Sequence, residues 1–250
     1  MIALHRSALR VGLALAAFTA GPAAHAGVQI DGTRVIFNEG MPEATLRVQN
    51  PGSNPVLLQS WVDTLGKQAT PTTTTAPFML LPPISRVEAG KSQVLRMRVV
   101  GHDLPRDRES AFFLNVLEVP AVSRESDTGD GYLQITVRNR LKIFYRPKGL
   151  EGRGAGAAAA AVQWKMVADQ GAWSLQAVND SPYHVSMVKA WLVQGQKETE
   201  AEGMQMLTPR STTSFKLPGV TGSPANATLK VRYINDFGGV VNTTLPLSSP

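Results

Sequence analysis

The sequence predicts an all-β protein built from two tandem immunoglobulin-like β-sandwich domains. Three observations predict it: short apolar runs separated by turn residues, many glycines and prolines (22 and 17) beside only 6% aromatic residues, and a strand–turn–strand pattern that occurs twice. The chain of 250 residues is long enough for one large domain or two of ordinary size. No apolar run reaches the roughly 20 residues that span a bilayer, so we expect no membrane span.

Residues 1–26 have the features of a secretory signal peptide. Arg6 and Arg10 supply the positive start, residues 11–20 form a short apolar segment, and Ala-His-Ala at 24–26 is a cleavage site. The alternative, an N-terminal membrane anchor, would need an apolar stretch about twice as long. We expect cleavage after Ala26 and an exported protein.

The N-terminal domain is expected at residues 27–147, where apolar runs alternate with turns. The pattern predicts strands over 33–37, 44–49, 56–62, 78–81, 95–99, 111–119 and 132–146. Turn residues at 50–55 and the Pro82-Pro83 pair separate several of these runs.

A linker is expected at 148–161, because glycines are dense there and an alanine run follows. Short β runs resume in the expected C-terminal domain, 162–250. They lie at 162–167, 173–178, 185–193, 214–217, 228–233 and 240–245.

The two halves share a pattern, VQNPGSNPVLLQSWV at 48–62 and AVNDSPYHVSMVKAWL at 177–192. Each has a strand that ends at Asn, a proline-containing turn and a second strand that ends at Trp. We expect Trp61 and Trp191 to point into two sandwich cores. Coincidence is the alternative interpretation.

The sequence gives no sign of an active site. Only His102 and His184 remain after cleavage, no His or carboxylate cluster has metal-ligand spacing, and cysteine is absent. No nucleophile elbow or P-loop occurs. We therefore expect no enzyme, no catalytic residues, no metal and no cofactor. The net charge of +6 is spread along the chain, so nucleic-acid binding is not indicated.

The predicted strand at 132–146 is much longer than the usual 5–6 residues. Leu133, Ile135 and Val137 alternate with polar residues. This aliphatic stripe has two interpretations that periodicity alone does not separate. It packs in the protein's own core, or it lies on an open sheet edge that adds to a partner's sheet.

Arg34 and Lys142 lie within apolar β runs. Outward-facing charge is the commoner fate of such residues. The alternative is a pair that converges on one carboxylate of a bound chain terminus.

Five motifs together resemble the PapD-like periplasmic chaperones of the chaperone–usher pilus pathway. They are DGTRVIF at 31–37, LPPISRVEAG at 81–90, RESAFFLNVLEVP at 108–120, LKIFYRP at 141–147 and YINDFGG at 233–239. The resemblance covers essentially the whole exported chain. It implies two immunoglobulin-like domains in an L shape, a periplasmic location, pilin subunits and an outer-membrane usher as partners, and the short-loop subclass.

The resemblance also implies roles for individual residues. Strand 132–146 would be the donor strand that fills the open groove of a subunit, with Leu133, Ile135 and Val137 as the inserted residues. Arg34 and Lys142 would bind the carboxyl terminus of the subunit. An interdomain ionic network would consist of Glu109, Arg146 and Asp236, and Pro55 would lie in a loop near the cleft.

The numbering of strand 132–146 raises a question of geometry. Lys142 has an even residue number, whereas the residues of the aliphatic stripe have odd numbers, so a regular strand places them on opposite faces. Both face the cleft only if the strand is irregular between them. We therefore expect an irregularity near Arg138–Leu141.

Two other classes of protein remain as alternatives. A pilus subunit or another adhesive sandwich module would normally have a single incomplete domain with its own donor extension. A carbohydrate- or metal-binding module would need an aromatic platform or clustered ligands, and the sequence offers neither.

Overall fold

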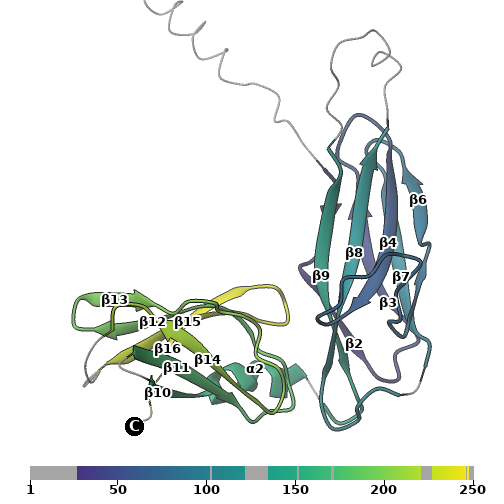
Figure 1. Cartoon of the computed structure of the whole chain (residues 1–250). Coiled ribbons are helices and arrows are strands. Elements are labelled where there is room, and N and C mark those ends of the chain that lie inside the picture. Colours follow the sequence, from purple (N-terminus) through teal and green to yellow (C-terminus); the bar gives the residue numbers. More distant parts are fainter. Residues whose placement is uncertain are drawn as a thin grey trace, which may run out of the picture.

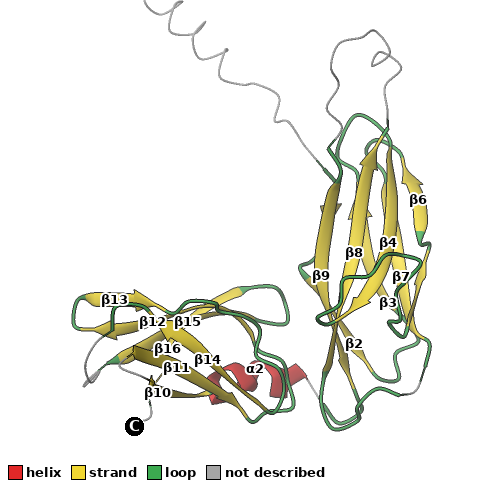
Figure 2. Cartoon of the chain, viewed as in Figure 1, coloured by secondary structure: helices red, strands yellow, loops and turns green. Residues whose placement is uncertain are grey.

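The computed structural model describes residues 27–101, 103–121, 135–150, 152–169, 172–220, 227–245 and 247. These residues form two β-sandwiches that meet at one corner in an L shape (Figure 1). Strands make up both sandwiches, and one helix, α2 (Gly152–Ala161), lies at the junction (Figure 2). The prediction of two tandem immunoglobulin-like β domains in an L shape is confirmed.

The N-terminal sandwich packs a five-stranded sheet against a four-stranded one. The five-stranded sheet, in spatial order, contains β2 (Arg34–Asn38), β9 (Val137–Arg146), β8 (Ser110–Pro120), β4 (Val56–Thr64) and β6 (Ile84–Val87). The four-stranded sheet contains β1 (Gln29–Ile30), β3 (Ala44–Gln49), β7 (Ser92–Val99) and β5 (Phe78–Leu81). Leu95, Leu114 and Ile143 are among the side chains fully buried between them.

The C-terminal sandwich has the same plan with fewer strands. One sheet contains β13 (Lys197–Glu200), β12 (Ser186–Gln194), β15 (Thr228–Ile234) and β16 (Val240–Leu245). The other contains β10 (Gln163–Asp169), β11 (Ala172–Asn179) and β14 (Ser211–Leu217). Trp164, Leu175 and Leu229 are fully buried in its core.

The sequence pattern did not predict the three short strands β1, β6 and β13. β1 has two residues, β6 directly follows the Pro82-Pro83 pair, and β13 contains no apolar residue, so none of them shows an alternation of apolar and polar residues. The strand expected at 132–146 is described from Val137 onward. Ile135 and Thr136 precede it without regular pairing, and Leu133 lies outside the described residues.

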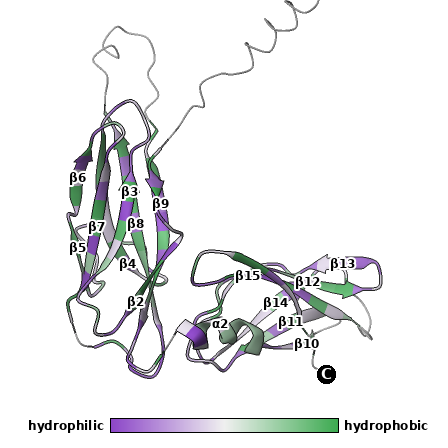
Figure 3. Cartoon of the chain, turned by 180° about the vertical axis from the view of Figure 1, so that it is seen from behind, coloured by the Kyte–Doolittle hydropathy of each residue, from purple (hydrophilic) through white to green (hydrophobic). Residues whose placement is uncertain are grey.

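The segment expected to be a linker contains α2 instead, so that expectation is wrong for residues 152–161. Ala158 and Ala159 are buried in the C-terminal core. Alanine is the strongest helix former, but the many glycines, which are poor helix formers, made the segment resemble a linker. Beyond its polar first turn, α2 is weakly hydrophobic (Figure 3). Neither α2 nor any other helix of the described chain has the length and hydropathy of a membrane span.

The two tryptophans of the repeated pattern do not occupy the cores, so the expectation of inward rings is wrong. Trp61 is buried but lies outside the core cluster, which contains its neighbour Val62. Trp191 is half-buried, and its ring lies beside Lys189 and Arg232. Successive side chains of a strand point to opposite faces, so the residue after each tryptophan faces inward.

The two copies of the strand–turn–strand pattern share a buried asparagine, and in each copy the two strands belong to different sheets. Asn50 Nδ2 donates to the carbonyl oxygens of Asn54 (2.8 Å) and Val87 (3.0 Å). Asn179 Nδ2 donates in the same way to Tyr183 and Thr208, both at 2.8 Å. In each turn the Oδ1 atom accepts from the backbone N–H two residues later. The asparagine thus ties each turn to a second loop.

The irregularity expected near Arg138–Leu141 is absent from β9. This strand pairs with β8 in unbroken register from Tyr145 opposite Ser110 to Val137 opposite Glu118. Val137 and Lys142 therefore project from opposite faces of β9. Among the described strands of the other domain, β12 does shift register, between Met187 and Lys189.

We predict that Asn50→Ala and Asn179→Ala each lower the free energy of unfolding by about 1–3 kcal/mol, because two carbonyl groups lose the buried side chain that donates to them. Urea denaturation measures this. Asn54→Ala is the control, since that exposed residue contributes only its backbone oxygen. Equal midpoints for the three variants would contradict the structural role of the buried asparagines.

Candidate functional site

Strand β9 carries the site because its neighbours change along its length. From Lys142 to Arg146 it lies between β8 and β2, and β2 runs parallel to it with Arg34 opposite Lys142. From Val137 to Leu141 only β8 pairs with it among the strands that the structure describes. Ile135 and Val137, beside this open edge, are 63% and 42% exposed. The sheet therefore has an unpaired edge with aliphatic side chains, which soluble proteins normally avoid.

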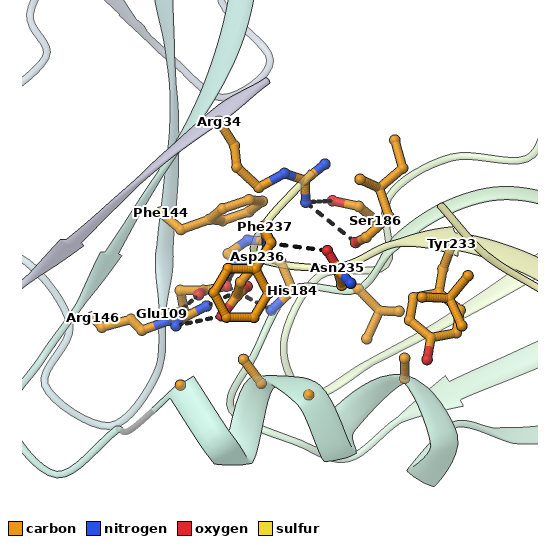
Figure 4. A pocket seen from close by; sticks show the side chains of 17 residues that line it. Arg34, Glu109, Phe144, Arg146, His184, Ser186, Tyr233, Asn235, Asp236 and Phe237 are labelled. Carbon is orange, nitrogen blue, oxygen red and sulfur yellow. Dashed lines mark hydrogen bonds and ion pairs between the residues drawn. The ribbon is translucent and has the colours of Figure 1, made fainter. Parts of the chain in front are cut away.

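Arg34 and Lys142 lie side by side at the point where the open edge begins. An Arg34 terminal nitrogen donates to Ser186 Oγ (3.4 Å) and to the carbonyl oxygen of Ile234 (3.2 Å). Lys142 Nζ donates to the same Ser186 hydroxyl at 3.4 Å. The structure thus brings together the two cations that the sequence singled out, and it adds Ser186 from the C-terminal domain. Figure 4 shows Arg34 beside Ser186.

Neither cation is electrostatically satisfied. Burial lowers the pKa of Arg34, although Asp236 and Glu109 partly oppose this. Burial and the neighbouring charge of Arg34 lower the pKa of Lys142. Within the described ranges no carboxylate lies at ion-pair distance from either cation, and Arg34 Nε is buried without a hydrogen-bond partner. An anion placed here would stabilise both charges.

Arg146, on the same face of β9, has the opposite environment. Its Nε donates to Glu109 at 2.8 Å, and its two terminal nitrogens bind the Asp236 carboxylate at 2.8 Å each. The Arg146 and Glu109 side chains are 3% and 1% exposed. Burial acts to lower the pKa of Arg146, but the hydrogen bonds to Asp236 and Glu109 outweigh burial and raise it. Arg146 is therefore a fully paired cation that joins the two domains.

His184 completes this network, although the sequence offered no reason to select it. Its backbone N–H donates to Glu109 Oε2 (2.8 Å), and its Nδ1 lies 2.9 Å from the same oxygen. Its ring also packs against Phe144, with 5.7 Å between the centroids. No local pattern places His184 near the cleft, because the matching turn of the other domain, around Pro55, lies at the opposite end of β8 from Glu109.

The turn at 235–239 presents Asp236 to Arg146. Asn235 Oδ1 accepts from the backbone N–H groups of Phe237 (3.1 Å) and Gly239 (2.9 Å). Gly238 has φ +81°, and a Cβ there would overlap Thr33 of the N-terminal domain. The sharp turn therefore needs glycine at this position. It leaves Phe237 96% exposed in the cleft.

A cavity of about 320 Å³ lies between Arg34 and α2. Figure 4 shows Arg34 and Ser186 on one side of it, the Arg146 network on another and α2 beneath. Its lining includes Phe144, Tyr233 and the small residues of α2. The cavity is thus largely apolar, with charged groups at its edge.

Pro55 does not lie near this cleft, so that expectation is wrong. The pairing of Val56 with Pro120 places it at the end of β8, and Glu109 immediately precedes the other end of that strand. Pro55 instead lines a separate groove with Leu57, Arg86 and Val119.

Two family profiles match the chain. The one described as "Pili and flagellar-assembly chaperone, PapD N-terminal domain" matches residues 27–151, and "Pili assembly chaperone PapD, C-terminal domain" matches residues 157–245. The chain is 43% identical over 228 residues to chaperone protein FimB/FhaD of Bordetella pertussis, covering 88% of this chain and 87% of that protein.

Solved structures are also similar. The crystal structure of the YadV chaperone matches with a TM-score of 0.74 and 35% identity, over 88% of this chain and 99% of that one. The Salmonella enterica SafB chaperone, solved with the SafA pilin, gives a match with a TM-score of 0.72 and 27% identity, over 90% and 98% of the two chains. From the sequence motifs, the two-sandwich fold and these matches, we conclude that the chain belongs to the family of PapD-type pili assembly chaperones.

Proposed function

We propose that this protein is a non-enzymatic periplasmic chaperone that binds pilus or fimbrial subunits through its open edge strand and delivers them to an outer-membrane usher. One observation carries the proposal: an unneutralised, partly buried cation pair lies where the unpaired edge of β9 begins. The SafB chaperone bound to the SafA pilin supports the choice of partner.

The cation pair supports one direction for the bound segment. A strand added beside Val137–Leu141 would lie in line with β2, which runs parallel to β9 and begins at Arg34. The end of the added strand that meets Arg34 and Lys142 is stabilised there if it is negative. A chain carries its negative charge at its carboxyl terminus. We therefore propose that the subunit's last strand runs parallel to β9 and ends at the two cations.

The aliphatic stripe supplies the apolar part of the interaction. Val137 lies on the same face of β9 as Leu141 and Ile143, which are buried in the N-terminal core. Ile135 precedes Val137 by two residues and is exposed, and Leu133 continues the same alternation in the sequence but lies outside the described residues. We propose that these three residues enter the open core of the subunit. Burial of one such side chain contributes about 1.5–3 kcal/mol before the costs of association.

The Glu109–Arg146–Asp236 network has a geometric role in this proposal. It holds the C-terminal domain where Ser186 meets Arg34 and Lys142.

We also propose that residues 1–26 are a signal peptide, removed after Ala26 on export to the periplasm. The domain division after residue 147 is likewise a proposal, with α2 assigned to the C-terminal domain.

The proposal is tested by co-expression with a pilin subunit and co-purification. We predict that Arg34→Ala and Lys142→Ala each abolish recovery of a one-to-one complex, because the subunit carboxylate loses charge-assisted hydrogen bonds. The unfolding free energy should not fall, since burial disfavours both charges in the free protein. Lys165→Ala, at an exposed position of β10, is the charge-matched control. Full recovery with both cleft variants would refute the anchor.

Ile135→Asp tests the donor strand. Because Ile135 is 63% exposed in the free protein, we predict a nearly unchanged melting temperature together with loss of subunit binding. Thr136→Asp, also exposed and next in sequence, controls for disruption of the strand. An Ile135→Asp protein that melts far below both wild type and Thr136→Asp would place Ile135 in the core.

The interdomain network should respond unequally to the loss of its two carboxylates. Glu109→Ala leaves the buried Nε of Arg146 and the backbone N–H of His184 without a partner, and we predict a loss of about 3–5 kcal/mol in unfolding free energy. Asp236→Ala removes the contact between the domains but leaves the Arg146–Glu109 pair intact, so we predict a smaller loss of unfolding free energy than for Glu109→Ala, together with a changed small-angle scattering curve. Wild-type scattering for Asp236→Ala would contradict the geometric role.

A further inference from the structure

We propose that the cavity beside the cation pair binds the side chain of the subunit's last residue and favours an apolar, preferably aromatic, residue there. This inference rests on the proposed function, because it assumes that the subunit carboxylate binds Arg34 and Lys142.

The residues that line the cavity indicate which kind of chemical group would bind there. Ala155, Gly156 and Ala159 of α2 form one wall, and Tyr233 and Val241 contribute from the facing sheet. The charged groups Glu109, Arg146 and Asp236 also line it, but they are bonded to one another. Arg34, also part of the lining, keeps an unpartnered Nε among the described residues. An apolar chamber with one unneutralised cation fits a ligand with a carboxylate next to an apolar group.

The position of the cavity next to Arg34 indicates which residue of the subunit would place its side chain there. A carboxylate within reach of Arg34 and Lys142 is one bond away from the Cα of its own residue, so the adjoining side chain is that of the last residue. Phe144, which lines the cavity, lies on the same face of β9 as Lys142. The volume of about 320 Å³ is at the low end of ligand pockets, which suits one ring-sized side chain and not a longer segment.

Phe237 gives a second, independent observation. A phenylalanine that is 96% exposed is unusual, and this one lines the cavity on a turn fixed by Asn235. A bound aromatic side chain would cover part of the Phe237 ring in an edge-to-face or offset contact. The exposed ring thus supports an aromatic occupant over a small one.

Gly156 allows the cavity to be filled without disturbing the fold. A Cβ at this position meets no heavy atom within 4 Å, and the residue lies in α2, where leucine is a better helix former than glycine. Gly156→Leu therefore places a side chain in the cavity from the helix wall. Gly156→Ala is the matched control, because it improves the helix but leaves most of the space open.

The experiment measures binding of synthetic peptides of alternating valine and threonine that end in Phe, Leu, Ala or Gly with a free carboxylate. We expect the wild-type protein and Gly156→Ala to bind the Phe-ended peptide about tenfold or more tightly than the Gly-ended one. Gly156→Leu should bind all four with the affinity of the Gly-ended peptide. Arg34→Ala and an amidated Phe-ended peptide should both lose binding.

The outcomes separate this inference from the proposed function. Equal binding of the four peptides by wild type, with Arg34 still required, would overturn the pocket and leave the carboxylate anchor in place. A preference for Phe that survives Gly156→Leu would also overturn the pocket. Binding that does not depend on Arg34 or on a free carboxylate would overturn both.

Discussion

The ion pairs of Arg146 are the interaction on which the rest of the site depends. One guanidinium, almost completely buried, binds a glutamate of its own domain and an aspartate of the other. Breaking a buried pair of this kind is costly, because the remaining charge stays buried without a partner. The two sandwiches are thus held at an angle that brings Ser186 and the turn at 235–239 against the N-terminal sheet. The cleft, the cavity and the position of Phe237 all follow from this angle.

Along one face of β9, two cations have opposite electrostatic environments. Arg146 is paired on every side, and its hydrogen bonds outweigh the cost of its burial. Lys142, four residues earlier, is partly buried beside Arg34 with a serine hydroxyl as their shared partner. Arg146, which is paired, stabilises the arrangement of the two domains. Arg34 and Lys142 have no carboxylate partner among the described residues, and burial of their charges lowers the stability of the free protein. A bound anion would offset this unfavourable burial of charge.

The other face of β9 explains how one strand can serve both fold and function. Leu141 and Ile143 fill the N-terminal core, while Val137, on the same face of β9, and Ile135, two residues before it, remain exposed. Because the register with β8 is unbroken, this stripe and the cations lie on opposite sides of the strand. An added strand would therefore meet the stripe through its side chains and the cations through its carboxyl end.

The sequence by itself determined the fold class, most strand positions, the family and the residues of the cation pair and interdomain network. These properties follow from local alternation, turn residues and short motifs, which are all visible within a few neighbouring positions. Only the tertiary structure decided the rest. Ser186 and His184 reach the site through contacts across more than seventy intervening residues with Glu109 or Arg34, which no local pattern encodes. Strand register and the choice of which sheet faces which are fixed only when distant segments pack together. They determine the direction of Trp61 and Trp191, the regular path of β9, the location of Pro55 and the packing of α2.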